Sequence, residues 1–142
     1  MDTSPFQLDH VGIAVHSIEE SMPLFERLAN ARGGEIEDVA AQGVRVAFVG
    51  TGSARLEVIE PVTQQSTIAR FLEKRGSGLH HIAYRVPDIR AALADFESQG
   101  IQLIYREPRP GAGGHLVAFL QPRTTGGVLV ELVEVPNSTA GA

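Results

Sequence analysis

The chain has 142 residues, of which 43% are hydrophobic, and a formal net charge of −5. This length suits one ordinary domain or two small units, and the acidic balance argues against binding to nucleic acid through phosphate contacts. Because there is no cysteine, disulfides, thiolate metal ligands and cysteine nucleophiles are excluded. No apolar run could span a membrane, and Met1–Phe6 is too short for a signal peptide, so we expect a cytoplasmic protein without membrane partners.

The first half of the chain opens with an alternating stretch. Small and bulky residues alternate over residues 8–15, which predicts a strand with His10 on the face opposite the bulky aliphatic side chains. Ser17 and Glu20 then form a capping box, the usual start of a helix, and Pro23 should kink that helix. The elements predicted for the rest of this half are a helix to about Asn30, strands over 43–49 and 54–60, and a helix over 66–75.

The second half of the chain predicts a similar order of strands and helices. Residues 80–86 predict a strand with His81 on the same face as Ala83, which corresponds to the His10 face of the opening strand. Pro87 and Asp88 then predict the start of a helix. The further predicted elements are that helix to about Ser98, strands over 101–105, 116–121 and 128–133, and a flexible tail over 136–142.

An internal repeat links the two halves. His10 and His81 are 71 residues apart (81 − 10), and Glu57 and Glu131 are 74 apart (131 − 57). We therefore expect a β-α-β-β-β module to occur twice, at about 7–62 and 78–135, packed side by side into one curved sheet. This predicts an α+β fold with a single domain over 1–142. The step of 71 also relates Val15 to Val86, Ile18 to Ile89 and Phe25 to Phe96.

Four polar residues fall at equivalent positions of the two modules, each opposite the bulky aliphatic face: His10, Glu57, His81 and Glu131. A carboxylate buried alone in a sheet is costly, so two of them need a cation. Two imidazoles and two carboxylates suit a six-coordinate divalent ion with open positions for water or substrate. One strand histidine is usually structural, but the pattern matched across the repeat favours a metal site.

The other three histidines have different expected roles. His80 shares the parity of Ile82 and Tyr84, so we assign it to packing. His16 and His115 are expected to be exposed, with His115 as a candidate for substrate contact.

Across essentially its whole length the chain resembles the vicinal oxygen chelate superfamily and, within it, the methylmalonyl-CoA epimerase family. The histidine strands would fit any member of the superfamily, whereas the helix that runs into Gly78–His81 and the glycine loop are more specific. The residues that carry the resemblance are Asp9–Val15, Gln42–Val44, Leu56–Pro61, Ser66–Gly76, Gly78–Ala83, Glu107–Arg109, Gly111–Gly114 and Gly126–Leu132.

The resemblance implies paired modules that form a metal-bearing cup, usually in a homodimer. It implies metal ligands at His10, His81 and Glu131, with Glu57 at a fourth position that holds Glu or Gln in relatives. Cobalt (Co2+) is the first metal implied, with Mn2+, Ni2+ or Zn2+ as other possible ions.

The implied reaction is inversion at C2 of an acyl-CoA substrate, methylmalonyl-CoA, through a metal-stabilised enolate. Inversion needs two positioned acid/base groups, and Glu131 and Glu57 are the expected pair. The chain departs from some relatives by Val46 in place of a glutamate and by Gln121 in place of a histidine. Cationic candidates for the CoA phosphates are Lys74, Arg75, Arg106, Arg109 and Arg123.

Three other readings remain open. Glyoxalase I, of the same superfamily, would also use two histidines and two glutamates, on an enediolate. A non-catalytic ligand-binding module of this fold would tend to lose the metal ligands, and here all four are present. An extradiol dioxygenase would use two histidines and one glutamate around iron, usually in a longer chain.

Overall fold

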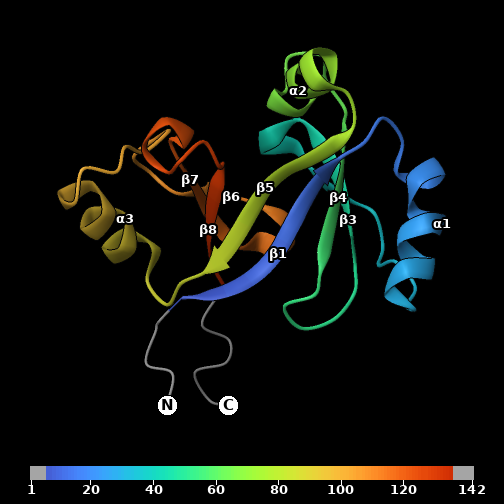
Figure 1. The fold of residues 1–142 in the computed structure, drawn as a ribbon, viewed down its shortest axis with the longest axis horizontal. Coiled ribbons are helices and arrows are strands. Elements are labelled where there is room, and N and C mark those ends of the chain that lie inside the picture. Colours follow the sequence, from blue (N-terminus) through green and yellow to red (C-terminus); the bar gives the residue numbers. More distant parts are fainter. Residues whose placement is uncertain (1–5, 136–142) are drawn as a thin grey trace. The chain divides into compact units, whose positions relative to one another are not determined.

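The computed structural model describes residues 6–135. Along the chain the elements follow the order β-α-β-β-β, a linking helix, and β-α-β-β-β again (Figure 1). The described residues fall into two compact units, one formed by His10–His80 and the other by the residues on either side of it. The tail expected over 136–142 lies outside the described residues.

The first unit contains β1 (Gln7–Ala14, shared with the second unit), α1 (Ile18–Ala29), β2 (Glu37–Val39), β3 (Val44–Val49), β4 (Leu56–Pro61) and α2 (Thr67–Arg75). Its strands have the hydrogen-bonded order β2-β3-β4-β1, with β1 parallel to β4 and the other pairs antiparallel. Ser17 caps α1 by accepting a hydrogen bond from the Glu20 N–H, and Ser66 caps α2 by accepting one from the Ala69 N–H.

The second unit contains β5 (Gly78–Arg85, shared with the first unit), α3 (Ile89–Ser98), β6 (Arg109–Pro110), β7 (Leu116–Leu120) and β8 (Val130–Glu134). The strand order is β5-β8-β7-β6, with β5 parallel to β8 and the other pairs antiparallel. Asp88 caps α3 by accepting a hydrogen bond from the Ala91 N–H. The 3-10 helices of the described chain are Ala40–Gln42 in the first unit, and Ala112–Gly114 and Pro122–Thr124 in the second.

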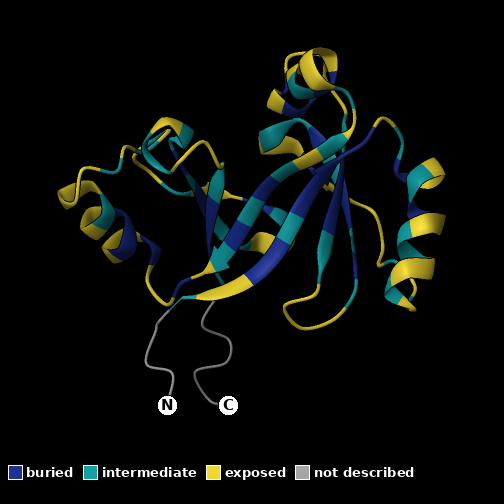
Figure 2. Cartoon of the chain, viewed as in Figure 1, coloured by how far each residue is buried: buried dark blue, intermediate teal, exposed yellow. Residues whose placement is uncertain are grey.

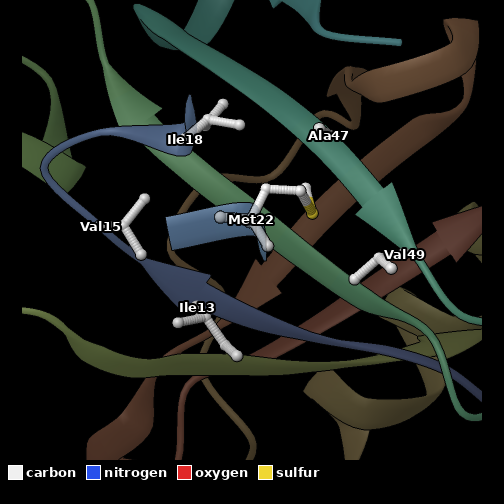
Figure 3. Packing of buried hydrophobic residues seen from close by; sticks show 7 residues of the cluster. Ile13, Val15, Ile18, Met22, Ala47 and Val49 are labelled. Atoms are coloured by element: carbon white, nitrogen blue, oxygen red, sulfur yellow. The ribbon is translucent and has the colours of Figure 1, made fainter. Parts of the chain in front are cut away.

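Each unit buries one face of its sheet under a helix. In the first unit, Ile18 and Met22 of α1 pack on the bulky face of β1, through Ile13, and on the neighbouring strands (Figure 3). In the second unit, Ile89 and Leu93 of α3 lie in the corresponding apolar cluster. The strands are largely buried while the outer helix faces are exposed (Figure 2), so hydrophobic burial on the helix side fixes which strand face is left for polar groups.

A carboxylate links the last strand of each unit to the start of its helix. Glu60 of β4 accepts a hydrogen bond of 2.8 Å from the Ile18 N–H, and Glu134 of β8 accepts one of 2.8 Å from the Ile89 N–H. A carboxylate at a helix N-terminus accepts a hydrogen bond from an otherwise unpaired backbone N–H, and its negative charge interacts favourably with the helix dipole. Neither contact could be predicted from local sequence patterns, because each joins residues more than forty positions apart.

The α+β class and most elements are confirmed, but the strand predicted over 101–105 is wrong. Ile101, Leu103 and Tyr105 pack against the apolar cluster of α3, which explains the apolar pattern. The segment reaches β7 through only one isolated bridge, between Leu103 and Leu120. The sequence analysis missed β2 and β6, because strands of three and two residues carry little periodicity. Among the described residues, no helix is long and apolar enough to cross a membrane.

Candidate metal centre

The first unit contains a buried histidine–glutamate pair. The parallel register of β1 and β4 pairs Gly12 with Glu57, which puts Glu57 on the same sheet face as His10. The Nε2 atom of His10 lies 3.2 Å from Oε1 of Glu57. Both residues are less than a tenth exposed, so this strand face carries a pair of ionisable side chains inside the protein.

The second unit contains an equivalent pair, built in the same way. The parallel register of β5 and β8 pairs Ala83 with Glu131, so Glu131 shares a face with His81. The Nε2 atom of His81 lies 3.1 Å from Oε1 of Glu131, and both residues are buried. In each unit the glutamate is therefore paired with the residue two positions after the histidine.

A phenylalanine supports each histidine. Phe48 of β3 lies opposite Glu57 and stands T-shaped to His10, with ring centroids 5.3 Å apart. Phe119 of β7 lies opposite Glu131 and stands T-shaped to His81, at 5.8 Å. The sequence analysis missed both rings, although they are separated by the same 71 residues (119 − 48) as the two histidines.

In each unit an arginine stacks on an aromatic ring near the histidine–glutamate pair. The guanidinium carbon of Arg55 lies 4.2 Å from the centroid of Phe48. In the second unit Tyr105 stands T-shaped to Phe119 at 6.4 Å, and the guanidinium carbon of Arg109 lies 3.7 Å from the centroid of Tyr105. Burial raises the pKa of the Tyr105 phenol, and the Arg109 charge opposes this shift. The phenol is therefore neutral at ordinary pH.

The remaining histidines lie apart from the two pairs. His80 packs T-shaped against Phe71 at 5.0 Å, as its strand parity predicts. His16 is exposed, as expected. The expectation of an exposed His115 is wrong, because this residue is half-buried. Its ring lies near Gly113: a Cβ atom added to Gly113 would be 3.3 Å from Nε2 of His115.

The structure also shows the surroundings of Val46 and Gln121, the two positions where the resemblance is incomplete. Val46 of β3 is buried, on the same strand face as Phe48, so this position offers packing and no carboxylate. Gln121 lines a groove of about 470 Å³ beside two of the candidate CoA-binding arginines, Arg106 and Arg123. Within this groove, Arg123 donates a hydrogen bond to the Gln102 side-chain oxygen.

The residues present fit a metal ion. In each unit the buried histidine and glutamate offer donor atoms that a metal ion could use: His10 and Glu57 in the first unit, His81 and Glu131 in the second. The donor atoms are imidazole nitrogens and carboxylate oxygens, which suit a borderline divalent cation. A cation would also compensate the charge of two buried carboxylates.

An α+β fold with repeated parallel strand pairs and buried histidine–glutamate pairs defines a class of metal-binding domains, the vicinal oxygen chelate fold. Residues 9–119 match the model of the glyoxalase/bleomycin resistance protein/dioxygenase superfamily, and the chain belongs to this superfamily. It is 47% identical to the uncharacterized protein YqjC of Bacillus subtilis, over 90% of this chain and 91% of that protein. It is 38% identical to human mitochondrial methylmalonyl-CoA epimerase, over 89% of this chain and 72% of that protein.

Solved structures give the same relationship. The methylmalonyl-CoA epimerase of Mycobacterium tuberculosis aligns with a TM-score of 0.89 and 35% identity, covering 100% of this chain and 97% of that chain. A single-residue variant of the Streptomyces coelicolor methylmalonyl-CoA epimerase, in complex with 2-nitronate-propionyl-CoA, aligns with a TM-score of 0.86 and 33% identity. That alignment covers 94% of this chain and 96% of that chain.

Proposed function

We propose that the protein is a metal-dependent epimerase that inverts C2 of methylmalonyl-CoA through an enolate, by 1,1-proton transfer. The observation that carries this proposal is the pair of buried histidine–glutamate contacts at equivalent positions of the two units. Relatives named methylmalonyl-CoA epimerase cover most of the chain, which supports the same reaction here.

In this proposal the ligands of one divalent ion are His10, Glu57, His81 and Glu131. Cobalt is the first choice and Mn2+, Ni2+ or Zn2+ are the alternatives. When bound, such an ion supplies a Lewis acid that stabilises negative charge developing on the substrate oxygens.

The two glutamates are proposed as the acid/base groups. Inversion requires one group to remove the C2 proton and another to return a proton to the opposite face. Glu57 and Glu131 are buried carboxylates carried by different strands, β4 and β8. Val46 occupies the place where some relatives have a glutamate, and its buried side chain cannot transfer a proton.

The test is exchange of the C2 proton with solvent deuterium, followed by NMR on methylmalonyl-CoA with metal-loaded protein. Glu57→Gln and Glu131→Gln should each abolish exchange, because an amide cannot accept the proton. Glu73→Gln, an exposed site on α2, is the matched control and should exchange like the wild type. Retained exchange in both active-site variants would rule out the two-glutamate scheme.

Parallel assays separate the alternative functions. Turnover of methylglyoxal with glutathione, and none of (2S)-methylmalonyl-CoA, would identify a glyoxalase I instead. A purified protein that contains no metal and binds a small molecule without turnover would identify a non-catalytic binding module. Metal analysis of the purified protein comes first, since it also identifies the ion.

We further propose that the protein acts as a single-domain homodimer in the cytoplasm, on acyl-CoA substrates of propionate metabolism. The names of the relatives and solved structures support the acyl-CoA substrate. Light scattering of the purified protein tests the dimer: a monomer mass would contradict it.

A further inference from the structure

Arg55 lies beside the histidine–glutamate pair of the first unit. It directly precedes β4, and Leu56 is paired with Val11 on β1. Since alternate residues of a strand share a face, Arg55 lies on the face of Glu57 and in the same row as His10. The Val11 N–H donates a 3.1 Å hydrogen bond to the Arg55 carbonyl, which fixes this register.

The guanidinium of Arg55 stacks on an aromatic ring of β3. Its carbon lies 4.2 Å from the Phe48 ring centroid, and Phe48 in turn packs against His10. Its Nε atom is buried and makes no hydrogen bond with any described residue, 6–135. Buried polar atoms in native proteins normally have a partner, so an unpaired donor beside the His10–Glu57 pair calls for an explanation, and a bound anion is one such explanation.

Gly50, which follows β3, lies close to the backbone of Arg55. The antiparallel register pairs Val49 with Leu56, so the next pair brings Gly50 opposite Arg55. Gly50 has a φ of +104°, and an added Cβ would lie 2.3 Å from the Ala54 carbonyl oxygen. A side chain at this position would therefore be strained and would collide with the chain next to Arg55.

We propose that Arg55 binds the carboxylate of a malonyl-type acyl group and is a specificity-determining residue of the enzyme. This inference rests on the proposed function. The planar guanidinium offers a fork of N–H donors that matches a carboxylate, and stacking on Phe48 keeps it oriented. Arg55 would favour thioesters with a carboxylate on the reacting carbon over those without one.

The expected kinetic signature is in KM. The substrate carboxylate is charged both before and during removal of the C2 proton, so its contact with Arg55 stabilises the ground state and the transition state alike. Loss of such a uniform interaction raises KM with little change in kcat. A hydrogen bond to a charged group corresponds to roughly a 10- to 100-fold change in affinity.

The experiment compares Arg55→Met and Arg55→Gln with the wild type, all metal-loaded, by C2 proton exchange on two substrates. One substrate is methylmalonyl-CoA and the other is methylmalonyl-pantetheine, which lacks the CoA phosphates. We expect KM to rise about 10- to 100-fold on both substrates, and methylguanidinium to restore part of the affinity in Arg55→Met. Arg27→Met, an exposed arginine on α1, is the matched control and should keep the wild-type KM.

Two results would contradict carboxylate binding by Arg55. A KM within about twofold of wild type in a folded Arg55→Met or Arg55→Gln protein would overturn the inference. So would a rise seen with methylmalonyl-CoA alone, which would assign Arg55 to a CoA phosphate. A metal-loaded wild-type protein that exchanges no C2 proton would overturn the proposed function, and the inference with it. Arg55→Gln keeps the test valid if the methionine variant does not fold.

Discussion

Phe48 and Phe119 hold equivalent positions in the two halves of the chain. Each ring stands T-shaped to a histidine, at 5.3 Å from His10 and 5.8 Å from His81. Each also lies opposite a glutamate on the neighbouring antiparallel strand. The edge contact restricts rotation of the imidazole and excludes water from its side, which favours a fixed ligand geometry.

Replacing either phenylalanine by leucine should therefore weaken metal binding. We expect Phe48→Leu and Phe119→Leu to raise the Kd for Co2+ by about tenfold, the lower end of the effect of groups that orient metal ligands. Isothermal titration calorimetry on metal-free protein measures this. Phe71→Leu is the matched control, because Phe71 makes the same T-shaped contact with His80, which is not a proposed ligand. An equal loss of affinity in all three variants would indicate a general loss of stability instead.

Metal binding should stabilise the fold through His81 and not through His80. A ligand that binds only the folded state adds about 2.7 kcal/mol at 100 times its Kd, so Co2+ should raise the Tm of the wild type and a chelator should lower it. We expect His81→Ala to lose most of this metal-dependent shift and His80→Ala to keep it. Thermal unfolding with and without metal tests this, and a shift lost only in His80→Ala would show that the parity assignment is wrong.

Strand parity could separate these adjacent histidines because it depends only on alternation along one strand. His81 is buried beside Glu131, whereas His80 is half-buried against Phe71. The repeat relates His81 to His10 and Glu131 to Glu57, which form the equivalent pair in the first unit. Local periodicity and self-similarity thus predicted the α+β class and the four residues that form the two pairs.

What could not be predicted depends on contacts between segments distant in the sequence. The helix-capping roles of Glu60 and Glu134 require the strand order, since each reaches a helix more than forty residues away. The support of the histidines by Phe48 and Phe119 requires the antiparallel register. The segment 101–105 has the apolar pattern of a strand, but it packs on the core with only one bridge to β7.

The pair formed by Asp9 and Arg85 should contribute to stability. Asp9 is buried, and Nε and Nη2 of Arg85 donate to its Oδ1 at 3.2 and 2.9 Å. Because the Arg85 side chain is 45% exposed, solvent reduces the benefit, and we expect Arg85→Ala to lower the free energy of unfolding by about 1–2 kcal/mol. Urea unfolding measures the change.

The control for Arg85 is another arginine on the same unit. Arg90 lies 3.9 Å from Glu107, and both side chains are mostly exposed. Arg90→Ala should change the free energy of unfolding by less than about 0.5 kcal/mol. Equal effects of the two substitutions would show that the Asp9 contact adds nothing specific.

The stability of the protein should fall above pH 10 in a way that depends on Tyr105. Burial raises the pKa of this phenol above its ordinary value of 10.0, so between these two values the unfolded chain has lost a proton that the folded chain keeps. The contribution of Tyr105 to the free energy of unfolding is therefore complete below pH 10, and it is lost as the pH rises through the folded-state pKa of this phenol. The chain has two tyrosines, so in a Tyr84→Phe background tyrosinate absorbance near 295 nm reports Tyr105 alone. Because the Arg109 charge lowers this pKa, Arg109→Met should move the titration to higher pH, and a downward shift would contradict the stacking of Arg109 on the ring.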